Sequence, residues 1–178
     1  AVSEGIRQNL DNQKKIFIEP FFSTMQLIMA GNDTEGLRYG TIETPEKYYL
    51  KWVEEGGDFA AEPNALDRHL LQVCSKARLL ELVHDFVVFD AGTKKLCRQN
   101  QYFGVKAAQS FIARREGGII WHTLGSGKSL TMVFLMRKHR TDALLRCFRV
   151  VVVTDRHDLE RQLSDTATLT GQNVLRAT

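Results

Sequence analysis

Apolar residues occur in short runs before about residue 64 of this chain and at helical spacing after it. The apolar run at residues 25–30 predicts a buried strand. Glycine, asparagine and aspartate at residues 31–33 predict the turn that ends this strand, because these residue types tolerate positive φ angles. Thr44 and Pro45 predict the start of a helix that Thr44 caps. The aromatic residues expected on the apolar side of that helix are Tyr48, Tyr49 and Trp52.

Helical periodicity dominates the middle of the chain. Between residues 66 and 83 the apolar positions recur at intervals of three and four, which predicts a helix. These positions are Leu66, Leu70, Val73, Ala77, Leu80 and Val83. The change of pattern places a predicted domain boundary near Asn64, so that residues 1–64 and 65–178 are expected to belong to different domains.

Two further elements follow this helix. Residues 86–89 are β-branched and aromatic, and they predict a short strand that ends at the turn formers of residues 90–92. Residues 99–115 predict a helix, which the glycine pair at 117–118 stops.

The last third of the chain predicts a βαβ unit. Residues 119–121 and 148–154 predict strands, and the second run is so continuously apolar that we expect a parallel strand covered on both faces. A helix beginning at about Lys128 joins the two strands, and another helix begins at about Asp155. This order predicts an α/β fold with a right-handed crossover and a mainly parallel sheet.

Composition narrows the class of protein only slightly. The 178 residues include 24 lysines and arginines against 21 aspartates and glutamates, a scattered excess that is weak support for a nucleic-acid partner. Three widely spaced cysteines argue against a disulfide framework and a zinc site, and favour a reducing cytoplasm. No apolar run reaches the roughly 18 residues of a membrane span, and the first residues lack the order of a secretory signal.

A glycine-rich loop carries the clearest chemistry. Gly125 and Gly127 permit a tight backbone wrap, and the following helix would direct its positive pole at an anion. Lys128 would reach the β- and γ-phosphates of a nucleotide, and the Ser129 hydroxyl would ligate the bridging Mg²⁺. The general phosphate-loop pattern has a glycine where this chain has His122. The alternative is a glycine-rich surface turn that happens to precede a lysine and a serine.

Residues 117–132 resemble motif I of the R subunit of type I restriction enzymes, a superfamily 2 helicase-like motor. In that superfamily the first glycine of the pattern is commonly replaced, which accommodates His122. Residues 152–163 resemble motif Ia of the same family, and residues 98–103 resemble its adenine-reading glutamine segment. The similarity is looser before Asn64, where residues 25–32 are like the segment that follows the family's nuclease core.

The resemblance implies a role for particular residues. Gln101 is the candidate adenine reader, with an exposed glutamine at a helix start as the alternative. Thr154 and Arg156 are candidate contacts to the DNA backbone, with a solvated helix cap as the alternative. The candidate nucleotide contacts are Gln101, Thr123, Gly125, Ser126, Gly127, Lys128 and Ser129, of which Lys128 is the candidate catalytic residue.

The resemblance also implies a fold and a function. Residues 1–64 would be an α+β segment from the end of an endonuclease domain, and residues 65–178 the beginning of a RecA-like ATPase domain with a partial parallel sheet. The implied ligands are ATP, Mg²⁺ and double-stranded DNA, and the implied partners are methyltransferase and specificity subunits, with no membrane. The nuclease residues are expected before Ala1 and the acidic motif II after Thr178, so this piece alone is expected to hydrolyse and cleave nothing.

Two other readings of the loop stay open at this point. One is a different superfamily 2 helicase, acting on DNA or RNA. The other is a small nucleotide-binding module that is complete in itself.

Overall fold

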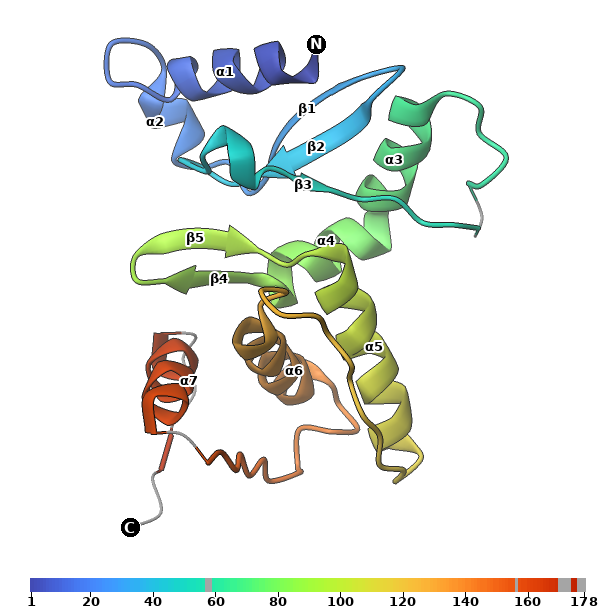
Figure 1. Ribbon diagram of the computed structural model, residues 1–178, viewed down its shortest axis with the longest axis vertical. Coiled ribbons are helices and arrows are strands. Elements are labelled where there is room, and N and C mark those ends of the chain that lie inside the picture. Colours follow the sequence, from blue (N-terminus) through green and yellow to red (C-terminus); the bar gives the residue numbers. More distant parts are fainter. Residues whose placement is uncertain (57–58, 156, 170–173, 176–178) are drawn as a thin grey trace.

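The computed structural model describes the whole chain except residues 57–58, 156, 170–173 and 176–178 (Figure 1). The strands are β1 (Ile28–Asn32), β2 (Gly36–Gly40), β3 (Leu50–Lys51), β4 (Val87–Asp90) and β5 (Thr93–Leu96). The helices are α1 (Val2–Asn12), α2 (Glu19–Phe22), the short 3₁₀ helix η1 (Glu46–Tyr48), α3 (Ala65–Cys74), α4 (Lys76–Asp85), α5 (Gln99–Ala113), α6 (Lys128–Thr141) and α7 (His157–Leu169). None of the helices in the described part of the chain is long and apolar enough to cross a bilayer.

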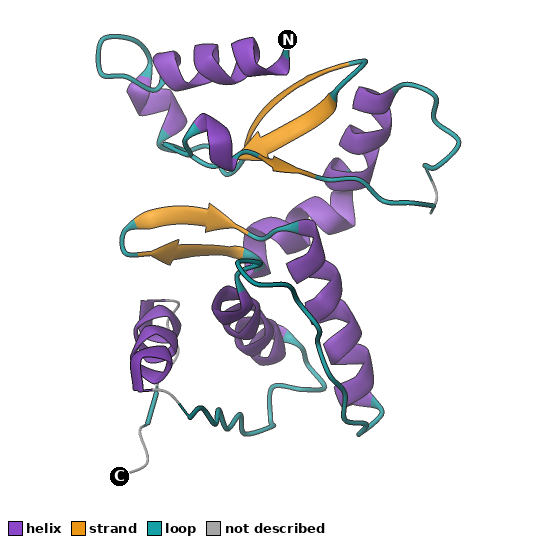
Figure 2. Cartoon of the chain, in the orientation of Figure 1, coloured by secondary structure: helices purple, strands orange, loops and turns teal. Residues whose placement is uncertain are grey.

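Strands β1, β2 and β3 form an antiparallel sheet at one end of the molecule (Figures 1 and 2). Alternate side chains of β1 point to opposite faces, so Ile28 packs with Ile6 of α1 while Met29 packs into the main core. Helix α3 lies very close to the main-core face, since a Cβ on Gly31 would come within 2.4 Å of Leu66 Cδ1. The two helices therefore hold the sheet from both sides.

The strand predicted at residues 25–30 is present but shifted toward the carboxyl end. It runs to Asn32 because the turn begins two residues later than expected, at residue 33, and Asn32 Oδ1 accepts hydrogen bonds from the backbone N–H groups of Thr34 and Glu35. Gly31, which was expected in the turn, lies in the strand, and its missing side chain leaves room for α3.

The helix predicted from Thr44 is wrong in length. Only the short 3₁₀ turn η1 forms, and Thr44 caps nothing, since its Oγ accepts from the backbone N–H of Thr41 at 3.0 Å. The backbone becomes extended at Tyr49, because the next residues form β3 and pair with β2. Strand pairing has overridden the local helix signal here.

The periodicity from residue 66 to 83 belongs to two helices instead of one. Asn64 caps α3 by accepting hydrogen bonds from the backbone N–H groups of Leu66 and Asp67. Ser75, with φ −54° and ψ 134°, separates α3 from α4. Because of this break, α4 does not continue the apolar face of α3. Leu80 is 61% exposed although it fits the apolar spacing.

Strands β4 and β5 form an antiparallel hairpin, which confirms the short strand predicted near residues 86–89. The turn uses Ala91 and Gly92, both with positive φ. Strand β5 was not predicted because lysines occupy two of its four positions. Helices α5 and α6 form close to where the sequence predicts them.

One hydrophobic core extends from the first sheet to α6. Trp52 is fully buried, and its ring lies 6.1 Å from Tyr39 and 5.4 Å from Tyr102 of α5 between centroids. Phe86 continues the cluster from Tyr102 to Phe134 of α6. The core therefore runs across the predicted boundary at residue 64, and that boundary stays a prediction.

The strands predicted at residues 119–121 and 148–154 are not formed, and the described strands make two antiparallel sheets instead of a parallel one. Ile119 is 89% exposed and Val153 is 90% exposed. An apolar strand needs hydrogen-bonded neighbours on its edges and cover on its faces, and no described strand lies beside either segment. The fold is thus mixed α/β, without the predicted βαβ unit.

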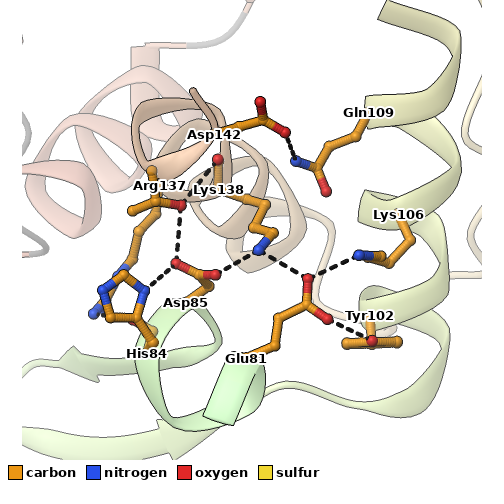
Figure 3. Close-up of polar contacts among 10 residues, drawn as sticks. Glu81, His84, Asp85, Tyr102, Lys106, Gln109, Arg137, Lys138 and Asp142 are labelled. Carbon is orange, nitrogen blue, oxygen red and sulfur yellow. Dashed lines mark hydrogen bonds and ion pairs between the residues drawn. The ribbon is translucent and has the colours of Figure 1, made fainter. Parts of the chain in front are cut away.

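An ionic cluster joins α4, α5 and α6 (Figure 3). Lys138 of α6 lies between two carboxylates of α4, 2.8 Å from Glu81 and 2.6 Å from Asp85. Glu81 also accepts hydrogen bonds from the Tyr102 hydroxyl at 2.7 Å and from Lys106 at 2.8 Å. Burial raises the pKa of Glu81, but these three donors outweigh it and lower the pKa to about 2.

Replacing Lys138 with methionine should destabilise the fold by roughly 3 kcal/mol at pH 7, because it leaves two neighbouring carboxylates without their shared cation. Urea unfolding measures the difference. The matched control is Lys14→Met, which removes an exposed ion pair with Asp11 and should change the free energy of unfolding by less than about 0.5 kcal/mol.

The destabilisation by Lys138→Met should shrink in acid. The folded-state pKa of Glu81 lies near 2, below its ordinary value of 4.5, so its stabilising contribution is present above pH 4.5 and is lost as the pH falls toward 2. Unfolding free energies of the two proteins should therefore converge between these pH values. A constant difference across this range would contradict the assignment.

Candidate functional site

The loop before α6 adopts a conformation that exposes main-chain donors. Gly125 and Gly127 have φ angles of 75° and 82°, in the region that side chains disfavour. The backbone N–H of Ser126 donates to the Thr123 carbonyl at 3.3 Å and closes a turn. Gly127 is the N-cap of α6, and no side chain in the described part of the chain caps the helix. The N–H groups of its first turn are therefore available to an anion.

Side chains of the loop are arranged around this helix start. The Lys128 ammonium donates to the Thr123 carbonyl at 3.0 Å and is otherwise exposed to solvent. Ser129 is half-buried in the first turn. The hydroxyl of Ser126 is buried and has no hydrogen-bond partner among the described residues. Because buried hydroxyls are almost always paired, the Ser126 hydroxyl is suited to a ligand oxygen.

Gln101 contacts the loop from the first turn of α5. Its side-chain Nε2 donates to the Gly127 carbonyl at 2.9 Å, and its Oε1 accepts from the backbone N–H of Arg98 at 2.8 Å. The residue is only 2% exposed. Gln101 is therefore buried beside the phosphate loop, unlike the exposed glutamine of the alternative, whereas its reading of adenine stays a prediction.

Arg98 is the contact residue that sequence reasoning missed. Its guanidinium donates to the Gly125 carbonyl at 3.2 Å. An arginine just before a helix has many surface roles, and no spacing rule connects it to a loop 27 residues away. Only the packing of α5 against α6 brings the two together.

His122, to which we assigned no chemistry, lies against α5. A Cβ on Gly104 would come 3.3 Å from His122 Nε2, so the small glycine makes room for the imidazole. This contact supports a structural role for the histidine.

The candidate DNA contacts are only partly described. Thr154 is half-buried in the irregular segment before α7, and Arg156 lies outside the described residues. Both assignments stay predictions. The cysteines Cys74, Cys97 and Cys147 are free.

The chain is similar in sequence to known proteins. Residues 100–178 match the SWI2/SNF2 ATPase family. The chain is 37% identical over 112 residues to the HindI endonuclease subunit, a type I restriction enzyme subunit of Haemophilus influenzae. It is also 32% identical over 109 residues to the MjaIXP endonuclease subunit, a type I restriction enzyme subunit of Methanocaldococcus jannaschii. Each match covers 56% of this chain and 10% of the relative.

Over about half of its length the chain is similar to type I restriction enzyme endonuclease subunits. It spans about one tenth of the length of the curated relatives that it matches. The ATPase match begins within α5 and includes the phosphate loop, α6 and α7. This relationship confirms the resemblance drawn from the residues of motif I.

The backbone geometry of Gly127 gives a direct test of the loop. Gly127→Ala should lower the free energy of unfolding by about 1–2 kcal/mol, because alanine disfavours a φ of 82° and its Cβ would lie 2.7 Å from Gln101 Nε2. Urea unfolding with circular dichroism measures the change. Gly117→Ala is the control, since its Cβ would meet no atom within 4 Å. Equal stabilities for the two variants would contradict the conformation described for Gly127.

Proposed function

We propose that this chain binds Mg²⁺-ATP at the loop of residues 123–129, as the nucleotide-binding part of the motor in a type I restriction enzyme endonuclease subunit. The observation that carries the proposal is the uncapped start of α6, preceded by two glycines with positive φ and by a buried serine hydroxyl that bonds to none of the described residues. Converging donors around a helix N-terminus suit the oxygens of a triphosphate.

The side chains present suit this ligand. Lys128 can release the Thr123 carbonyl and place its charge near the β- and γ-phosphates. The Ser129 hydroxyl would ligate Mg²⁺, and the Ser126 hydroxyl and loop N–H groups would bind phosphate oxygens. Bound ATP would supply free energy through the loss of its γ-phosphate, and the chain's own residues would bind and orient that group.

We also propose that residues 119–121 and 148–154 are strands of a RecA-like parallel sheet in a longer chain. Support comes from their composition and exposure. Residues 150–153 are four consecutive valines, of which Val151 is 76% exposed and Val153 is 90% exposed. Such a run reaches a stable state when neighbouring strands pair with both of its edges and helices cover both of its faces.

The remaining assignments of the proposal come from the resemblance to type I restriction enzymes. A subunit of that kind would move and cut duplex DNA, with methyltransferase and specificity subunits as its partners in the cytoplasm. Residues 1–64 would then belong to the end of the nuclease domain, and Thr154 and Arg156 would contact the DNA backbone. Backbone contacts carry little sequence information, so this chain should discriminate bases weakly.

A second candidate is another helicase-like motor without a nuclease. The SWI2/SNF2 ATPase match favours it as much as a restriction enzyme, since that match covers residues 100–178 alone. An aspartate followed by a glutamate–x–lysine set, encoded upstream of Ala1, would favour the nuclease-linked motor, and its absence would favour the second candidate.

Lys128→Ala should weaken the binding of Mg²⁺-ATP at least tenfold, because it removes the one lysine of the loop. Titration with a fluorescent ATP analogue measures the affinity. Circular dichroism should be unchanged, since the Lys128 side chain is exposed. The matched control is Lys76→Ala, an exposed lysine at the first position of α4, which should bind like the unsubstituted chain.

Two results would contradict this proposal. Unchanged ATP affinity in Lys128→Ala would show that the loop is not the nucleotide site. ATP hydrolysis by this chain at the rate of a complete motor, abolished by Lys128→Ala, would contradict the expectation that the piece binds nucleotide without turnover.

A further inference from the structure

Two side chains at the start of α5 hold the carbonyl groups of the two positive-φ glycines. Arg98 Nη1 donates to the Gly125 carbonyl at 3.2 Å, and Gln101 Nε2 donates to the Gly127 carbonyl at 2.9 Å. The two glycines are the points where the loop backbone departs from ordinary conformations. The start of α5 therefore contacts the loop where its shape is set.

These contacts orient the donors that a phosphate would use. In a trans peptide the C=O and the following N–H point in opposite directions. Holding the Gly127 carbonyl toward α5 and α6 therefore directs the Lys128 N–H away from them. The same carbonyl also accepts from the N–H of Thr131 at 3.0 Å and from its hydroxyl at 3.2 Å, so Gln101 adds a tie from a second helix.

Gln101 is itself fixed in place. Its Oε1 accepts from the Arg98 N–H, which belongs to the residue that caps α5. The residue is 2% exposed, and a Cβ on Gly127 would come 2.7 Å from its Nε2. A side chain so enclosed acts on the loop without needing contact with a base.

Apolar packing contributes little to holding the first part of the loop. Thr123 and Leu124 at its beginning are exposed, Leu124 by 98%, so the hydrophobic core does not anchor this end of the loop. Ordering a free segment when a ligand binds opposes affinity, and contacts that order it beforehand remove that penalty.

We propose that Arg98 and Gln101 are positioning residues that hold the phosphate loop in its binding conformation and so strengthen the binding of the triphosphate whatever base it carries. This inference rests on the proposed function of the loop. It differs from adenine reading, in which Gln101 would act on the base and leave phosphate binding unchanged.

The test compares ligands with and without a base. Arg98→Ala and Gln101→Ala are made in the full chain, and the affinities for ATP, GTP and inorganic tripolyphosphate are measured by calorimetry with Mg²⁺. Positioning predicts that each variant loses about five- to tenfold in affinity, by a similar factor for all three ligands. A loss confined to ATP, with tripolyphosphate binding unchanged, would overturn the proposal.

Gln101→Glu separates the two hydrogen bonds of this side chain. The glutamate keeps an acceptor for the Arg98 N–H but places an oxygen against the Gly127 carbonyl, where a donor is needed. Tripolyphosphate affinity should fall at least as much as in Gln101→Ala. Affinity like that of the unsubstituted chain would overturn the proposal, because the lost contact to Gly127 would then have no effect.

Matched controls come from the far end of α5. Gln109→Ala removes a buried glutamine that donates to Asp142 at 3.3 Å, and Arg114→Ala removes an exposed arginine bonded to Glu116. Gln109→Ala should lower the melting temperature without changing tripolyphosphate affinity. An affinity loss equal to that of Gln101→Ala would overturn the proposal by showing a general effect of α5.

The unsubstituted chain tests the proposed function separately. If it bound none of the three ligands, the proposed function itself would be contradicted.

Discussion

The position of α6 depends on the ion pairs of Lys138 with Glu81 and Asp85, which fix the carboxyl-terminal half of the helix against α4. A helix start can act as an anion site only when the helix cannot rotate or slide. Phe134 and Val133, both fully buried, anchor the middle of α6 in the main core. The apolar contacts hold the axis, and the ionic cluster limits rotation about it. The uncapped first turn is consequently presented in one direction.

Helix α5 contacts both the hydrophobic core and the loop. Two adjacent residues of its first turn make these contacts. Tyr102 packs between Trp52 and Phe86 in the core, and Gln101 donates a hydrogen bond to the Gly127 carbonyl of the loop. Tyr102 also donates to Glu81, so the aromatic cluster and the ionic cluster meet at this one side chain. The first sheet, the hairpin and the loop are thereby connected through a single helical turn.

Much of the local structure could be predicted from the sequence, and the reasons are visible in particular residues. Asn64 caps α3 because asparagine bonds the free N–H groups of a helix start, whatever surrounds it. The start of α6 follows Gly127 because glycine alone enters the left-handed region easily. The helix expected from Thr44 did not form, because Leu50 pairs with Tyr39 of β2, a residue outside the local segment that carries the helix signal. Residues 119–121 and 148–154 have the apolar and β-branched side chains typical of strands. A strand also needs neighbouring strands to pair with, and its own residue types do not provide them.

The sequence by itself determined the glycine loop, the lysine and serine that follow it, and the similarity to type I restriction enzyme endonuclease subunits. These depend on residue type and spacing within a short segment, where backbone preferences and charge act locally. Only the tertiary structure decided that Arg98 and Gln101 would meet the carbonyl groups of Gly125 and Gly127, and that Ser126 would be buried. Such contacts join residues more than 25 positions apart. They exist because apolar burial packs α5 against α6, and no local preference encodes the place where two packed helices touch.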